Sequence, residues 1–155
     1  MRSSWPGLPH EAYMELVDRA LIDRGVMPGK FWAFYTAFPH LRSTSRRDEL
    51  LMCACVEWDA SRLLNRHGGL VWLWDDIGGW RIGITRPRDN RPVKGSLRPL
   101  PGFPIYAAPS ALADVADALA HKRRLPGPEA EQQHEWEGAA TARAAVDAFR
   151  SSGRR

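Results

Sequence analysis

The sequence has no long apolar run, only two cysteines and few lysines. No apolar stretch approaches the roughly 20 residues that a bilayer-spanning helix needs, and the first residues carry no signal-peptide pattern. The two cysteines, Cys53 and Cys55, are too close in the chain for an ordinary disulfide between strands, which favours a reducing compartment. We therefore expect a cytoplasmic protein that makes no contact with a membrane.

Motifs for catalysis, cofactors and metals are also missing. The sequence has no Gly-x-Ser-x-Gly elbow, no Walker loop and no dinucleotide fingerprint. Cys53 and Cys55 have no second cysteine pair or histidine at zinc-finger spacing, and His134 lacks the second histidine of a metalloprotease motif. The neighbouring Asp75 and Asp76 are more typical of a turn than of acid–base catalysis, since adjacent strand residues point to opposite faces. We expect a non-enzymatic protein without cofactor or metal.

The strongest structural signal is a β-hairpin over residues 70–85. Two apolar runs are separated by a short segment that contains aspartate and glycine, which is typical of paired antiparallel strands. One register makes one face of the hairpin wholly apolar, whereas a one-residue slip mixes the tryptophans with polar positions. That register pairs Trp74 with Trp80, Trp72 with Ile82, and Leu70 with Ile84. It leaves residues 76–78 as a three-residue loop, with Gly78 in the left-handed conformation.

Further elements flank the hairpin. Apolar residues at helical spacing predict an amphipathic helix over 8–25, with Gly25 as a left-handed stop. The aromatic-rich segment 30–38 favours a strand. Segment 47–64 stays open between a helix and a strand over 50–58 that is followed by a loop, because periodicity does not separate the two.

The second half of the chain predicts a loop, a short strand and two helices. Segment 86–104 is rich in Pro, Gly and Arg and predicts a surface loop. A short strand is expected at 103–107, and a helix capped by Ser110 follows it. An alanine-rich helix over 129–150 and a disordered tail complete the chain.

Together these elements predict an α+β fold. A small, mostly antiparallel sheet around residues 70–85 is packed by helices 9–24 and 110–123, with an appended C-terminal helix. With 155 residues and 44 % hydrophobic content, the chain is long enough for one sizeable core. Residues 1–125 are predicted to form a single domain, and residues 126–155 the C-terminal helix and tail.

The order of these elements resembles a known family. A helix over 13–25 leads to an apolar strand at 53–58, then to a Leu-x-Leu-Trp-Asp-x-x-x-Gly-Trp hairpin, and then to a Pro-containing strand and alanine-rich helix over 103–120. The hairpin residues here are Val71, Leu73, Trp74, Asp75, Gly79 and Trp80. Over about residues 12–120 the chain resembles a family of small actinobacterial proteins catalogued only as a domain of unknown function. The resemblance favours a strand at 50–58 and implies no activity.

Basic charge is concentrated in one segment. The window 86–98 holds five basic residues and one acid, a net charge of +4 that equals the net charge of the whole chain. Guanidinium groups match phosphate geometry, and prolines reduce the entropy lost when a loop becomes ordered on binding. This segment predicts a nucleic-acid-binding site formed by Arg81, Arg86, Arg88, Arg91, Lys94 and Arg98.

Two other interpretations stay open. Nineteen of the 22 basic residues are arginine, a bias that a GC-rich coding sequence also produces, so the segment could be a solvated loop without function. Seven tryptophans and the helix over 129–150 suggest a protein–protein interaction or assembly factor instead. The expected partner is therefore nucleic acid or, in the alternative, another protein.

Overall fold

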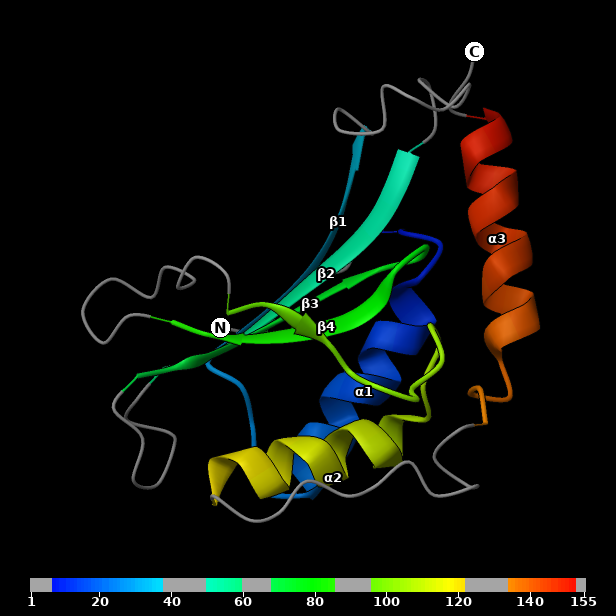
Figure 1. Cartoon of the computed structure of the whole chain (residues 1–155). Coiled ribbons are helices and arrows are strands. Elements are labelled where there is room, and N and C mark those ends of the chain that lie inside the picture. The colour runs from blue at the N-terminus through cyan, green and yellow to red at the C-terminus, as the bar shows by residue number, and fades with distance from the viewer. Residues whose placement is uncertain (1–6, 38–49, 60–67, 86–95, 122–133, 153–155) are drawn as a thin grey trace.

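A computed structural model describes residues 7–37, 50–59, 68–85, 96–121 and 134–152 (Figure 1). Within them the elements are, in order, α1 (Glu11–Asp23), β1 (Lys30–Ala37), β2 (Leu50–Trp58), β3 (Leu70–Asp75), β4 (Gly79–Ile84), β5 (Arg98–Pro99), α2 (Pro109–Ala120) and α3 (Ala139–Ser152). The strands form one antiparallel sheet in the order β1-β2-β3-β4-β5. The predicted α+β class is confirmed.

The hairpin forms in the predicted register. Trp74 lies opposite Trp80, and the two flanking apolar pairs follow as expected. The left-handed residue is Gly79, with φ 75°, and not Gly78. The Asp75 carboxylate explains the difference, because its Oδ1 accepts hydrogen bonds from the backbone N–H of Ile77 (3.0 Å) and of Gly78 (2.5 Å). These bonds hold the loop in a tight turn, and the chain re-enters the ladder only at Gly79.

Strand β2 lies between β1 and β3, which resolves the ambiguity at 47–64 in favour of a strand over 50–58. A central strand of this sheet is apolar on both faces, so its sequence shows no clean alternation. Even Cys53 and Cys55, which point away from the helices, are buried free thiols. The predicted strand at 30–38 is likewise confirmed as β1.

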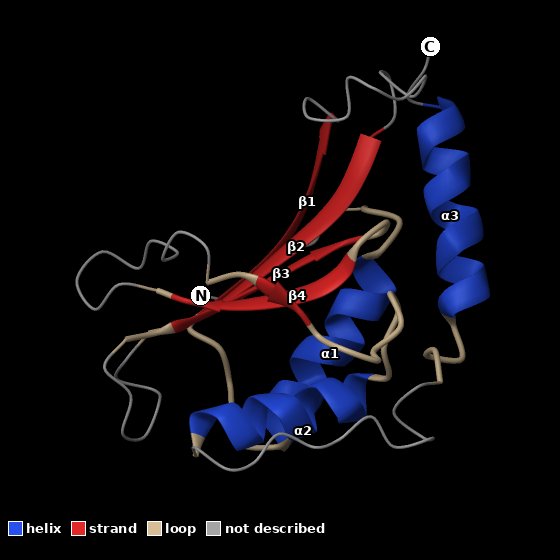
Figure 2. Cartoon of the chain, in the orientation of Figure 1, coloured by secondary structure: helices blue, strands red, loops and turns tan. Residues whose placement is uncertain are grey.

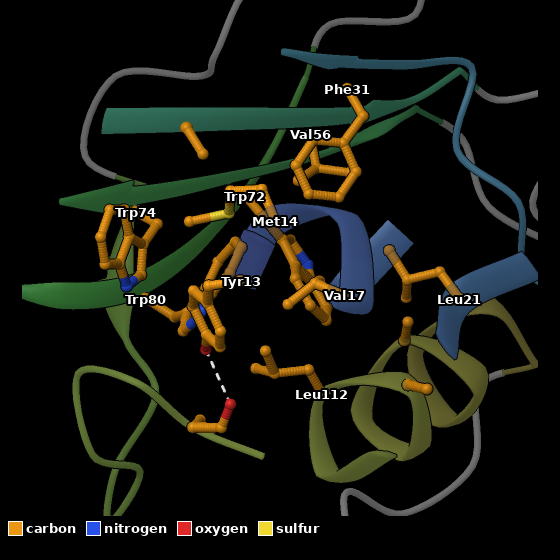
Figure 3. Close-up of a cluster of buried hydrophobic side chains, with 14 of the residues drawn as sticks. Tyr13, Met14, Val17, Leu21, Phe31, Val56, Trp72, Trp74, Trp80 and Leu112 are labelled. Atoms are coloured by element: carbon orange, nitrogen blue, oxygen red, sulfur yellow. Dashed lines mark hydrogen bonds between the residues drawn. The ribbon is translucent and has the colours of Figure 1, made fainter. Parts of the chain in front are cut away.

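The three helices cover one face of the sheet (Figure 2), and their apolar side chains join the tryptophans in one core. Tyr13 of α1 lies at its centre (Figure 3): its hydroxyl donates to the Ala107 carbonyl (2.7 Å) and accepts from Trp80 Nε1 (3.0 Å). The Nε1 of Trp74 donates to the carbonyl of Ile105 (2.7 Å). Buried aromatic side chains keep a polar partner in this way, which fixes their orientation.

Two predicted boundaries before α2 are wrong. The strand expected at 103–107 is absent except for an isolated bridge at Ala107, and β5 lies earlier, where Arg98 pairs with β4. A turn at Gly102, with φ 78°, separates the two segments. Helix α2 begins at Pro109 and not after a Ser110 cap. Proline suits this first position because its missing N–H would have no helical partner there.

Helix α3 begins later than the predicted start at 129. Residues 129–133 lie outside the described part of the chain, but residues 134–138 are not helical. The N–H of Trp136 donates to the carbonyl of Tyr106 (2.7 Å), and Glu135 forms an isolated antiparallel β-bridge with Ala107. These contacts hold the segment before α3 beside the segment before α2. The helix runs to Ser152, which includes two residues of the tail predicted as disordered. Three of its side chains enter the core: Ala139, Ala142 and Val146.

Candidate functional site

Two of the six predicted nucleic-acid-binding residues lie in the described part of the chain: Arg81 on β4 and Arg98 on β5. The other four lie in segment 86–95, outside the described residues: Arg86, Arg88, Arg91 and Lys94. The structure therefore defines the two ends of the predicted basic segment and the part of the sheet to which they attach.

The two ends of segment 86–95 are held together at the edge of the sheet. The Ser96 hydroxyl accepts a hydrogen bond from the N–H of Ile84 (3.2 Å) and donates one to the Ile84 carbonyl (3.3 Å). Leu97 lies over Gly83, where an added Cβ would be 3.0 Å from the leucine Cδ2. Because the ends are already fixed, the entropy of closing this connection is lost on folding and not on binding.

The connection from β2 to β3 leaves the sheet at the same end. The N–H of Thr85 donates to the carbonyl of Gly69 (2.9 Å), which brings the end of β4 beside the start of β3. A Cβ at Gly69 would lie 2.3 Å from the carbonyl oxygen of Trp58, so only glycine fits between β2 and β4. The end of segment 60–67 and the start of segment 86–95 therefore both lie close to Gly69.

This second connection contains two arginines that were not predicted as site residues, Arg62 and Arg66. Segment 60–67 lies outside the described residues, and its sequence holds no acid. The signal that could have found it is the strand order: in an antiparallel meander, alternate connections lie at the same end of the sheet. The predicted pairing of Leu70 with Ile84, combined with a strand at 50–58, already implied that segments 60–67 and 86–95 attach to the same end of the sheet.

Charge is divided unevenly along the chain. The described residues hold seven basic and 13 acidic side chains, a net charge of −6. The six remaining segments hold 15 basic and five acidic side chains, a net charge of +10, and the two parts together give the +4 of the whole chain. A coding bias toward arginine acts on every segment alike, so it does not account for this separation.

The two described site residues differ in their surroundings. Arg81 is 44 % exposed, and its Nη2 lies 2.9 Å from Oδ2 of Asp75, so an acid beside it offsets its charge. It lies four residues before Thr85, about 14 Å along the strand from the basic connections. Arg98 is exposed on β5. Arg98 lies opposite Ile82, one residue nearer than Arg81 to the basic end of the sheet, and two residues after Ser96, which follows segment 86–95 in the chain.

The acidic pair at the hairpin turn serves the fold. Asp76 accepts a hydrogen bond at Oδ1 from the N–H of Met52 (2.9 Å) and one at Oδ2 from Arg150 (2.5 Å). Arg150 also donates through Nε to the carbonyl of Leu50 (2.8 Å). This side-chain pair fastens the end of α3 to the turn and to β2, while Asp75 shapes the turn itself.

Three further titratable groups near the turn are buried. His10 lies against Trp74 with 5.5 Å between ring centroids, and its Nε2 donates to the carbonyl of Cys53 (2.8 Å). Its Nδ1 has no hydrogen-bond partner among the residues that the structure describes. Burial lowers the pKa of His10. Burial also raises the pKa of both thiols, Cys53 and Cys55, to about 12. At neutral pH the imidazole and both thiols are therefore uncharged.

Comparison of the chain with protein-family models, with curated proteins and with solved structures finds no match. The resemblance to the actinobacterial family stays a prediction. In the part of the chain that the structure describes, no helix is long and apolar enough to cross a membrane. Nor does any group of three or more His, Cys, Asp or Glu side chains there have an arrangement that could hold a metal ion.

Proposed function

We propose that the protein binds nucleic acid, as a non-enzymatic module, through the basic segment that joins β4 to β5. The residues proposed to make the contacts are Arg86, Arg88, Arg91, Lys94 and Arg98, with Arg62 and Arg66 as neighbours on the adjoining connection. The observation that carries the proposal is the separation of charge. The described body has a net charge of −6, and the two segments that attach side by side at one end of the sheet, 60–67 and 86–95, hold six basic side chains and one acid, a net charge of +5.

This charge distribution favours one orientation on a polyanion. Screening at physiological salt limits charge interactions to about 8 Å, so each part of the surface acts locally. The acidic helices and strands repel phosphates, whereas the basic end attracts them. Arginine suits this task because its planar guanidinium donates two parallel hydrogen bonds to a phosphate.

The proposed contacts are with the phosphate backbone and not with bases. Proteins that bind single strands by stacking present exposed aromatic rings. Four of the tryptophans on the described strands are buried in the core and unavailable for stacking: Trp58, Trp72, Trp74 and Trp80. We therefore expect binding that depends strongly on salt and weakly on sequence.

Fluorescence anisotropy with a labelled DNA duplex and a labelled single strand tests this function. If about four side chains neutralise phosphates on the duplex, log K falls with log salt at a slope near −3.6. Replacing Arg86, Arg88, Arg91 and Lys94 together with glutamine should bring the slope toward zero. A matched control replaces Arg19, which is exposed on α1, with glutamine and should leave the slope unchanged. A wild-type slope near zero, or a quadruple variant that binds like the wild type, would refute the proposal.

The alternative, a protein-interaction role, is favoured by one observation. Phe34 and Tyr35 on β1 are 36 % and 51 % exposed, so the strand offers one large aromatic side chain to a partner on each of its two faces. The C-terminal helix supports this alternative less, because its apolar side chains Ala142 and Val146 are already buried in the core. Deleting that helix would thus disturb the fold, and substitutions on β1 are the sharper test.

A further inference from the structure

Helix α3 differs from α1 in how little apolar surface it buries. Its three buried side chains are two alanines and one valine, whereas α1 buries a tyrosine, a methionine, a valine and a leucine. The other sides of α3 are exposed, at Ala140, Ala144 and Ala148 among other positions. Figure 1 shows α3 at the side of the molecule. Because stabilisation by burial follows the apolar area removed from water, packing alone holds α3 weakly.

The segment before α3 is anchored in the core. The N–H of Trp136 donates to the Tyr106 carbonyl, and the ring of Trp136 lies with its centroid 5.2 Å from that of Tyr13. Gly138 packs closely on the same ring, since a Cβ added there would be 2.3 Å from Cζ2 of Trp136. All of these contacts are made before Ala139, where the helix begins, so the anchor does not depend on the docking of α3 itself.

The C-terminal part of α3 is held mainly by polar contacts of Arg150. This side chain bonds to the Asp76 carboxylate and to the Leu50 carbonyl, and we call these two contacts the clamp. The clamp is largely buried, with Arg150 15 % and Asp76 5 % exposed. The Phe149 ring also meets the Tyr35 ring edge to face, but Tyr35 is 51 % exposed. Because an unpaired charge is costly in a buried site, the clamp contributes strongly to keeping α3 in place.

We propose that α3 opens and closes as a unit while the rest of the domain stays folded, with residues 136–138 as the pivot and the clamp as the contact that keeps it closed. Opening separates Phe149 from the Tyr35 ring, and it removes Arg143 from the face of the Tyr106 ring. A helix of 14 residues without its packing is marginal in water, so the opened segment also loses helical hydrogen bonds.

This device is separate from the proposed nucleic-acid site. The clamp lies at the hairpin turn, and segments 60–67 and 86–95 attach at the opposite end of β3 and β4. Opening of one element below the free energy of global unfolding is common in small domains, and such elements are the ones that move in regulation. The fold therefore has a two-state element whose balance the Arg150–Asp76 pair sets.

Native-state hydrogen exchange followed by NMR tests the opening. In the wild type, the amides of residues 142–149 should exchange at least about tenfold faster than those of β3 and than the Trp136 N–H, which stays bonded in the open state. Gly69→Ala strains the sheet away from α3, so it should speed exchange in β3 and leave exchange in α3 unchanged. Arg150→Ala should speed exchange in α3 at least about a hundredfold or remove its protection.

Asp147→Asn is the matched control on the same helix. Asp147 also lies near Arg150 (3.9 Å), but it is 79 % exposed, so its loss should change exchange in α3 by about fivefold at most. The wild-type and Gly69→Ala measurements do not depend on how well Arg150→Ala folds. Equal exchange of α3 and β3 in the wild type, a Gly69→Ala variant that speeds both alike, or an Asp147→Asn effect equal to that of Arg150→Ala would each overturn the proposal.

Discussion

Replacing Arg150 with alanine is expected to be among the most destabilising single changes on α3. Its side chain is 15 % exposed and its partner carboxylate on Asp76 is 5 % exposed. Removing one partner of a buried ion pair leaves an unpaired charge and costs about 3–5 kcal/mol. For a chain of this size, 1 kcal/mol shifts the melting temperature by about 2–4 °C, so we expect a fall of about 6–20 °C.

Arg143→Ala supplies the control on the same helix. Arg143 is also paired, with Glu135, but the two side chains are 46 % and 38 % exposed, and exposed pairs contribute at most about 1 kcal/mol. Its position over the Tyr106 ring adds about 0.5–1 kcal/mol at such a site. Urea unfolding of both variants measures the difference. Equal losses of unfolding free energy would show that burial of the Arg150–Asp76 pair does not set its importance.

Three further changes test the packing around the sheet. Gly69→Ala should lower the unfolding free energy by about 1–3 kcal/mol in urea titrations, because the new methyl group meets the Trp58 carbonyl, and an unchanged midpoint would contradict the close approach. His10 is neutral when folded and has a lowered pKa, so the wild type should lose stability as the pH falls below the ordinary value of 6.5, where the unfolded chain takes up the proton. His10→Gln should lack this loss between pH 6.5 and the folded pKa, and an identical pH profile for both proteins would refute the assignment. Cys53 and Cys55, whose pKa is about 12 instead of 9.0, should hold about a thousandfold less thiolate than free thiols and react with Ellman's reagent only after unfolding; rapid labelling of the native protein would contradict their burial.

Local features of the fold were predictable where one pattern dominated. The hairpin register followed from matching apolar residues across a short turn, and the structure pairs Trp74 with Trp80 as expected. The helix stop at Gly25 was also correct, with φ 83°. In both cases the decisive interactions lie between residues close in the chain, so the sequence contains the whole signal.

Features that depend on distant residues were not predictable. The start of α3 is set by the hydrogen bond from Trp136 to Tyr106, 30 residues earlier, which no local propensity reveals. Strand β2 read ambiguously because it is covered on both faces. For the candidate site, the basic segment was visible as a charge cluster. Its neighbour, with Arg62 and Arg66, became apparent only once the strand order brought Gly69 beside Thr85.

The most direct test of the proposed function compares how the DNA affinity depends on salt in the wild type and in a variant whose basic segment has lost its positive charges. Affinity for a DNA duplex is measured at several salt concentrations, with Arg86, Arg88, Arg91 and Lys94 present or replaced by glutamine. A wild-type slope near −3.6 that approaches zero in the variant, with thermal stability unchanged, is the predicted result. Equal slopes for the two proteins would contradict it, and would show that the basic segment between β4 and β5 does not carry the binding.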